Sequence, residues 1–160
     1  MNIDIEAIRQ KAGSLKGCLS HLKCQTSHSL NPIIDEPFAF GDPFIADEVK
    51  LLSSKVFRVL EHKTQVFTQP RNSLIRSRKS HVGEVQGVSV RTADHLGLNV
   101  NLVRAAAIGH DVGHVPFGHQ GEAWMAKAMN RKNFCHEVMG PIIVQKIERK
   151  GLGLNLTWET

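Results

Sequence analysis

Residues 107–122, AIGHDVGHVPFGHQGE, combine side chains that bind metals with side chains that move protons. The segment holds three histidines, an aspartate and a glutamate, separated by glycines and a proline that interrupt a helix. Histidine favours neither helix interiors nor cores, so a group this dense points to function rather than to packing. The residues concerned are His110, Asp111, His114, His119 and Glu122.

A divalent metal is the first chemistry that this segment suggests. A neutral imidazole beside a carboxylate suits a transition metal, or magnesium where oxygen ligands dominate. In a regular helix, His110 and Asp111 would point about 100° apart. They can therefore share an ion only where the helix ends, which Gly109 and Gly113 predict. His81 is the natural third ligand, although its spacing alone fits an ordinary helix-surface histidine equally well, and a carboxylate is expected as the fourth ligand.

Proton transfer is the second chemistry. His119 and Glu122 lie three residues apart at the start of a predicted helix, so their side chains can share one face. A glutamate beside an imidazole stabilises its charged form and fixes its orientation. We therefore expect His119 to donate a proton, or to stabilise negative charge on phosphate oxygens.

The elements that must position these residues are all predicted to be helical. Apolar residues at helical spacing predict a helix over 44–62, with Asp42 as its N-cap and Pro43 in its first turn. A second helix is predicted over 77–96 and ends at Gly97. Further helices are expected from an N-cap at Asn101, over 119–130, and from His136 to Gly151. The residues expected to face inward are Ile45, Val49, Leu52, Val56, Val59, Val85, Val88 and Leu96.

The composition suits one globular core in a chain of 160 residues, 41% of them hydrophobic and 22% charged. Residues 1–41 are poorly patterned, and 42–160 form the predicted domain. No stretch is apolar enough to span a membrane, and the N-terminus lacks the layout of a secretory signal, so we expect a cytoplasmic protein without a membrane partner. The net charge of +5 permits weak nucleic-acid binding as a secondary property.

The three cysteines do not suggest a disulfide framework. Cys18 and Cys24 alternate with His21 and His28, a combination that could bind zinc. The spacing matches no common zinc finger and also fits one stripe of a helix, which is the favoured interpretation.

Four sequence blocks resemble the deoxyguanosine triphosphate triphosphohydrolase family of HD-domain metal phosphohydrolases. His81 followed by His110-Asp111 is similar to the start of that family's H…HD…D pattern, and the blocks occur in the family's order. They are FRVLEHKTQVF (57–67), RSRKSHVGEV (76–85), HDVGHVPFGHQGE (110–122) and GLNLTWET (153–160). The resemblance covers roughly residues 42–160 and implies an all-α HD-domain helical bundle, present in part.

The resemblance also implies an activity and a cofactor. The family hydrolyses a deoxynucleoside triphosphate, dGTP or another dNTP, to the deoxynucleoside and inorganic triphosphate. It uses a divalent metal such as Mn²⁺, Mg²⁺ or Fe²⁺ and usually forms homo-oligomers. By resemblance, the metal ligands would be His81, His110 and Asp111; the catalytic residues His114, His119 and Glu122; and the substrate-binding residues Arg58, Gln65, Arg78 and His136.

Three departures from the family pattern leave a second interpretation open. Val115 replaces a proline of the family's usual motif, and ADEVKLLSS replaces a block that is usually basic. The family's final metal aspartate would lie beyond residue 160, so the chain looks C-terminally truncated relative to the family. The alternative to an active enzyme is therefore a non-catalytic HD remnant that binds nucleotide or metal. A different HD phosphohydrolase fits HVPFGHQGE less well.

Overall fold

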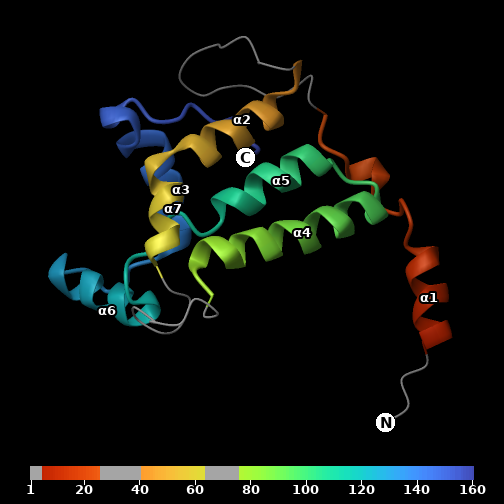
Figure 1. Cartoon of the computed structure of the whole chain (residues 1–160), viewed down its shortest axis with the longest axis horizontal. Coiled ribbons are helices and arrows are strands. Elements are labelled where there is room, and N and C mark those ends of the chain that lie inside the picture. The colour runs from red at the N-terminus through yellow and green to blue at the C-terminus, as the bar shows by residue number, and fades with distance from the viewer. Residues whose placement is uncertain (1–4, 26–40, 64–75) are drawn as a thin grey trace.

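The computed structural model describes residues 5–25, 41–63 and 76–160, and every regular element among them is helical (Figure 1). This confirms the expected all-α fold. The α-helices are α1 (Ile5–Ser14), α2 (Pro43–Ser53), α3 (Lys55–Val59), α4 (Arg78–Leu96), α5 (Val100–Gly109), α6 (Gly118–Ala128) and α7 (His136–Ile142). Short helical turns follow at Ser20–Leu22, Leu60–His62, Ile143–Ile147 and Arg149–Gly151.

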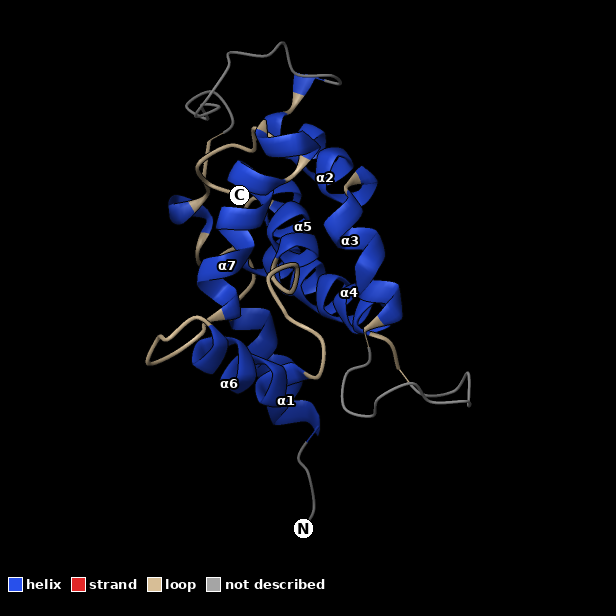
Figure 2. Ribbon diagram, turned by 90° about the vertical axis from the view of Figure 1, so that its left-hand side faces the viewer, coloured by secondary structure: helices blue, strands red, loops and turns tan. Residues whose placement is uncertain are grey.

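Three helices carry the centre of the fold, with α5 packed between α2 and α4 (Figures 1 and 2). The chain reverses between α4 and α5 at Gly97, whose φ of 78° lies in the left-handed region that glycine adopts without strain. Because α4 and α5 run antiparallel, the start of α4 and the end of α5 lie at the same end of the molecule (Figure 1). That end holds the candidate site.

Polar contacts fix α2 against α5. Asp42 caps α2 by accepting a hydrogen bond from the Phe44 backbone N–H (2.9 Å), and its other carboxylate oxygen accepts from the Asn101 side chain (2.9 Å). Further along the same pair of helices, the Arg104 guanidinium donates to both carboxylate oxygens of Glu48. The predicted N-cap of the first helix is therefore confirmed, and it also anchors the start of α5.

The single helix predicted over 44–62 is wrong, because Ser54 breaks it. The Ser54 hydroxyl accepts from the Phe57 backbone N–H (3.2 Å) and so starts α3 as a new helix. Within α2 the buried stripe runs through Phe44, Asp47 and Leu51, one residue away from the expected stripe. Three expected inward residues are exposed instead: Val49 (49%), Leu52 (44%) and Val59 (45%).

The hydrophobic core gathers residues that are far apart in the sequence, from Leu51 to Leu156. Its buried members come from α2, α3, the turn after α3, α4, the end of α5 and the C-terminal segment. They are Leu51, Phe57, Leu60, Val82, Ile108, Val112, Val144, Leu154 and Leu156. Val56, one of the expected inward residues, packs against this cluster.

The predicted helix ending at Gly97 is confirmed, but two details of this region differ. Val88 is 70% exposed, while the buried positions of α4 are Arg78, Val82 and Ala93. The N-cap of α5 is Asn99 rather than Asn101, because the Asn99 side chain accepts from the first N–H groups of the helix.

The helix expected from His136 to Gly151 changes type along its length. α7 contains Pro141 and continues into a π-helical turn, Ile143–Ile147. Gly140 is buried against Val112 and Gly113. At Gly113 the approach is so close that a Cβ would lie 2.0 Å from the His136 carbonyl oxygen. These glycines allow α7 to contact the turn that follows α5.

The N-terminal segment contains a helix, α1, that its weak patterning did not predict. Residues after α1 dock on the end of α4, where the Gly17 N–H donates to the His95 carbonyl (2.6 Å) and the Leu19 N–H to the Leu96 carbonyl (3.0 Å). The three cysteines are free thiols. None of the helices in the described ranges has the length and apolarity needed to cross a membrane.

Candidate metal centre and histidine cluster

The turn after α5 presents the His110-Asp111 pair at the end of the helix, as the flanking glycines predicted. Val112 is 1% exposed and anchors this turn in the core. The His114 N–H donates to the Asp111 carbonyl (3.2 Å), so the chain stays tightly curled. His110 and Asp111 therefore need not point about 100° apart as in a regular helix, and buried Val112 holds the turn that carries them.

His81, His110 and Asp111 converge in a way that fits a metal ion. Each offers a ligand atom, and these atoms all lie within 4.8 Å of one another. The His81 and His110 rings are 5.6 Å apart in an edge-on arrangement. His110 Nδ1 lies 2.7 Å from the Ala107 carbonyl oxygen, which can only accept, so Nδ1 carries the proton. Nε2 then keeps its lone pair, 3.6 Å from Asp111 Oδ1, as a metal ligand requires.

Asp111 also forms a buried ion pair with Arg78, which no sequence pattern had suggested. Arg78 Nη1 donates to Asp111 Oδ2 at 3.0 Å, and both side chains are about 5% exposed. Burial acts to raise the pKa of Asp111, but the hydrogen bond from His114 and the neighbouring positive charges outweigh it and hold the pKa far below its usual range. Asp111 is therefore ionised. Arg78, which was expected to bind a phosphate, contacts this carboxylate.

A second cluster surrounds Glu122 on α6. His136 Nδ1 lies 2.6 Å from Glu122 Oε1, and His119 Nδ1 lies 3.2 Å from Oε2, so one carboxylate orients two imidazoles. The His114 ring stacks on His136 with centroids 3.5 Å apart, and its Nε2 lies 3.2 Å from Asp111 Oδ1. Glu122 was expected beside His119, whereas its shorter contact to His136 spans a loop and was not foreseen.

The charge state of Glu122 follows from these contacts. Burial acts to raise its pKa, but hydrogen bonds from His119 and His136 and the charges of the nearby histidines lower it further than burial raises it. The net result is a pKa below the ordinary 4.5. The carboxylate is thus ionised at neutral pH and can hold Nδ1–H of both rings.

Lys63 contacts the same region from the turn after α3. Its Nζ donates to the His114 carbonyl oxygen at 2.6 Å, and its own carbonyl accepts from the Arg78 N–H at 2.8 Å. Burial, and then the charge of Arg78, lower the pKa of Lys63, while Asp111 acts in the opposite direction. No sequence pattern predicted a role for Lys63, because a contact across 51 residues leaves no local signal.

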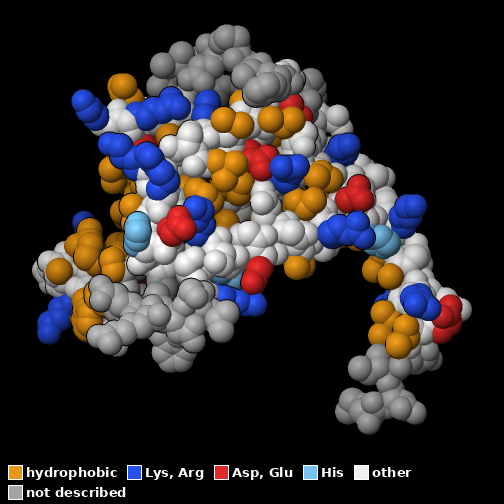
Figure 3. Space-filling model, in the orientation of Figure 1, with side chains coloured by type: hydrophobic (Ala, Val, Ile, Leu, Met, Phe, Trp, Pro, Cys, Tyr) orange, Lys and Arg blue, Asp and Glu red, His pale blue; other side chains and the backbone are white. Residues whose placement is uncertain are grey.

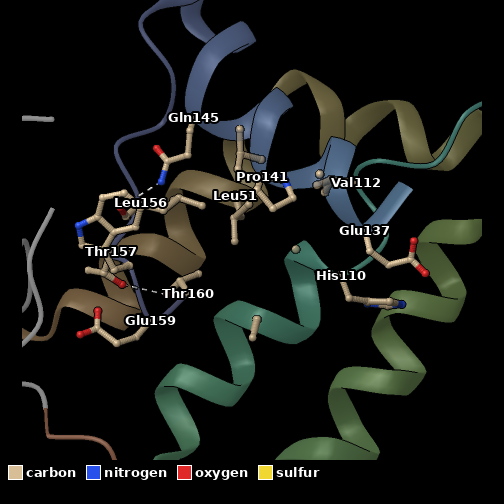
Figure 4. Close-up of a pocket in the computed structure, with 15 residues that line it drawn as sticks. Leu51, His110, Val112, Glu137, Pro141, Gln145, Leu156, Thr157, Glu159 and Thr160 are labelled. Carbon is tan, nitrogen blue, oxygen red and sulfur yellow. Dashed lines mark hydrogen bonds between the residues drawn. The ribbon is translucent and has the colours of Figure 1, made fainter. Parts of the chain in front are cut away.

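A groove of about 480 Å³ opens beside His110 and is lined mainly by aliphatic and aromatic side chains. Figure 4 shows His110 and Glu137 at one end of it, and Thr157, Glu159 and Thr160 at the other. Pro141 and Val112 lie between these ends. One ligand of the candidate metal centre therefore borders a space large enough for part of a small molecule.

Of the expected substrate-binding residues, Arg58 is not part of this arrangement. Gln65 lies outside the described residues. Arg58 lines a separate hollow of about 150 Å³ together with Lys55, Glu148 and Arg149, and none of its lining residues belongs to the histidine clusters. On the face of the molecule shown in Figure 3, Lys and Arg side chains gather over α2, α3 and the C-terminal segment. Glu148 accepts from the Val56 N–H (2.7 Å), so its carboxylate is occupied in holding α3.

The part of the chain that carries both clusters matches a known family. Residues 78–157 match the HD domain, a span that begins at the arginine of the ion pair and includes every member of both histidine clusters. The chain belongs to the HD-domain family. The adjacent His110 and Asp111 lie within this span and supply two of the three converging side chains.

The HD-domain chain is similar to bacterial proteins named deoxyguanosinetriphosphate triphosphohydrolase-like protein. It is 43% identical over 116 residues to one from Caldanaerobacter subterraneus subsp. tengcongensis, covering 72% of this chain and 34% of the relative. Identity to one from Cereibacter sphaeroides (strain ATCC 17029) is 38% over 147 residues, covering 89% and 39%. The resemblance expected from the motifs is therefore confirmed, and the chain spans only about a third of these relatives' length.

Proposed function

We propose that this HD domain takes part in metal-dependent hydrolysis of a deoxynucleoside triphosphate, dGTP or another dNTP, to the deoxynucleoside and inorganic triphosphate. The observation that carries the proposal is the convergence of His81, His110 and Asp111 within 4.8 Å, next to a carboxylate-oriented pair of histidines. The relatives' names support the same reaction.

His81, His110 and Asp111 would hold the divalent ion, which is Mn²⁺, Mg²⁺ or Fe²⁺ in our proposal. When bound, such an ion polarises the phosphoryl oxygen and activates a water molecule. Phosphoryl transfer otherwise needs positioning and charge stabilisation rather than covalent help. The cationic and imidazole groups around Asp111 would supply that stabilisation for the triphosphate.

His119 is suited to protonate the leaving sugar oxygen. Its Nδ1 faces Glu122, so the Nδ1–H donates to the carboxylate and Nε2 points away from it. The side chain is 89% exposed, which leaves Nε2 accessible to a substrate. A carboxylate on one nitrogen stabilises the protonated ring and sets its direction, as general acid catalysis requires.

The test is a product analysis. The purified chain is incubated with each dNTP and Mn²⁺, Mg²⁺ or Fe²⁺, and the products are separated by anion exchange. We expect deoxynucleoside and inorganic triphosphate, and their loss in His110→Ala, while His21→Ala keeps full activity because His21 is exposed and lies in neither cluster. Release of pyrophosphate or single phosphate would contradict the reaction.

A non-catalytic nucleotide or metal binder is the second candidate. The observation in its favour is that the candidate metal centre brings together three ligand residues of the described part of the chain. Binding of Mn²⁺ measured by calorimetry, without turnover of any dNTP, would favour this candidate. Homo-oligomerisation, cytoplasmic location and weak nucleic-acid binding stay predictions.

A further inference from the structure

We propose that Lys63 is a positioning residue that holds His114 in place. Through His114 it would keep the stacked His114–His136 pair in contact with Asp111. Its catalytic consequence rests on the function proposed above. Its structural consequence, the placement of the His114 and His136 rings, does not rest on that function, because the contacts are made by this chain's own residues. None of the expected metal-binding, catalytic or substrate-binding residues is this lysine.

The His114 ring has few bonds of its own to fix it. Its side chain is 7% exposed, yet Nδ1 forms no hydrogen bond with any described residue, although Glu122 Oε1 is 3.4 Å away. The ring is held by Nε2 against Asp111 and by its stack on His136. A ring with one hydrogen bond and one stacked face depends on where its backbone is placed.

The backbone of His114 is placed by Lys63. It follows Gly113, which lies so close to α7 that no side chain fits, and precedes Val115-Pro116, where regular structure is absent. The Lys63 ammonium donates to the His114 carbonyl at 2.6 Å from a partly buried position. A charge-assisted hydrogen bond in such a position is stronger than one between neutral groups.

The same residue also fixes the opposite side of Asp111. The Lys63 carbonyl accepts from the Arg78 N–H (2.8 Å), and Arg78 then pairs with Asp111 Oδ2 while His114 contacts Oδ1. One residue therefore sets the positions of both groups that flank the carboxylate. This double attachment distinguishes Lys63 from Lys79, which pairs with exposed Glu61 at 2.7 Å.

The first measurement is independent of activity. Ring protons of His114 and His136 carry a mutual ring-current shift because the rings are stacked. In NMR spectra of the full chain, we expect Lys63→Met to move both sets of signals, Lys63→Arg to return them towards their wild-type positions, and Lys79→Met to leave them unchanged. Unmoved His114 and His136 signals in Lys63→Met, with the chain folded, would overturn the proposal.

The second measurement is kinetic. For release of triphosphate, Lys63→Met is expected to lower kcat about 10- to 100-fold, as loss of supporting contacts does in other metal sites, with KM changed by less than about threefold. Lys63→Arg should recover most of the loss, and Lys79→Met should match wild type. Full kcat in Lys63→Met would count against a positioning role. If wild type releases no triphosphate, the proposed function fails, while the NMR result still decides the role of Lys63.

Discussion

At the scale of single residues, Asp111 has two roles to consider. The sequence predicts only metal binding, and the structure adds a buried ion pair. The type of Asp111 and its position next to His110 in the sequence predict a metal ligand. In the structure it is also the counter-charge of buried Arg78, at 3.0 Å, and the partner of His114, at 3.2 Å. Removing one member of a buried ion pair leaves the other charge uncompensated, which is strongly destabilising. Substitutions of Asp111 therefore report on folding as well as on metal binding.

The ionised Glu122 carboxylate is expected to stabilise the protein in a pH-dependent way. Its pKa in the folded protein lies below the ordinary 4.5, so its contribution to stability is present above that pH and is lost as pH falls through the folded pKa. We expect the free energy of unfolding of wild type to exceed that of Glu122→Gln at pH 7, and the difference to shrink below about pH 4.5. Urea unfolding of both proteins between pH 7 and pH 3 measures this.

Glu84→Gln is a suitable control for that experiment, because Glu84 is exposed and pairs with exposed Arg76 rather than with a histidine. Exposed pairs of this kind contribute little to stability, so its stability should track wild type across the whole range. A difference between wild type and Glu122→Gln that stays constant with pH would show that the His119 and His136 contacts do not depend on the Glu122 charge.

At the scale of elements, the site depends on how closely α7 approaches the turn after α5. A Cβ at Gly113 would lie 2.0 Å from the His136 carbonyl oxygen and 2.5 Å from the Gly140 nitrogen. Both are backbone atoms that cannot rotate away. The spacing of α7 and the turn therefore sets the stacking of His114 on His136.

Gly113→Ala should force α7 away from the turn and destabilise the protein by about 3 kcal/mol, within the range of strongly disruptive substitutions. Gly87→Ala is the matched control: it lies within α4, and its added Cβ meets nothing within 4 Å. That variant should gain about 0.5–1 kcal/mol from the better helix propensity of alanine. Thermal and urea unfolding of the two variants provide the comparison, and equal stabilities would contradict the close packing.

At the scale of the whole molecule, one buried carboxylate joins α2 to the segment around Thr157. Asp47 on α2 is fully buried, and its Oδ2 accepts from both the backbone N–H (2.8 Å) and the hydroxyl (2.7 Å) of Thr157. Lys50 on the same helix donates to the Asn155 carbonyl (2.9 Å). These contacts hold the C-terminal segment against α2 and carry Leu154 and Leu156 into the core.

Thr157→Val keeps the shape of the side chain but removes the hydroxyl donor to Asp47. We expect a loss of about 1–3 kcal/mol, because a buried carboxylate loses one of its two hydrogen bonds. Thr92→Val, on the exposed surface of α4, should change stability by less than about 0.5 kcal/mol. Urea unfolding distinguishes these outcomes, and a Thr157→Val protein as stable as Thr92→Val would show that Asp47 is held by other contacts.

Helix ends were predictable where a local side-chain contact creates them. Asp42 with Pro43, and Gly97 after the second helix, each act within a few residues, and the structure has both. The break at Ser54 acts locally as well, but serine also occurs inside helices, so an uninterrupted apolar pattern concealed it. Of the three positions in the helix predicted over 44–62 that were assigned to the inside but found exposed, only Val59 follows that break. Val49 and Leu52 precede it and are exposed because α2 buries the neighbouring stripe that includes Asp47 and Leu51.

The sequence by itself determined which residue types gather in one segment, namely types suited to metal binding at His110 and Asp111, at the end of a helix, together with the motifs of the HD family. These features are local, so neighbouring residues suffice to specify them. Only the tertiary structure decided which groups meet, namely Arg78 with Asp111, His136 with Glu122, and Lys63 with His114. Each pair is formed by segments packed together through a shared core, and no spacing along the chain records that packing.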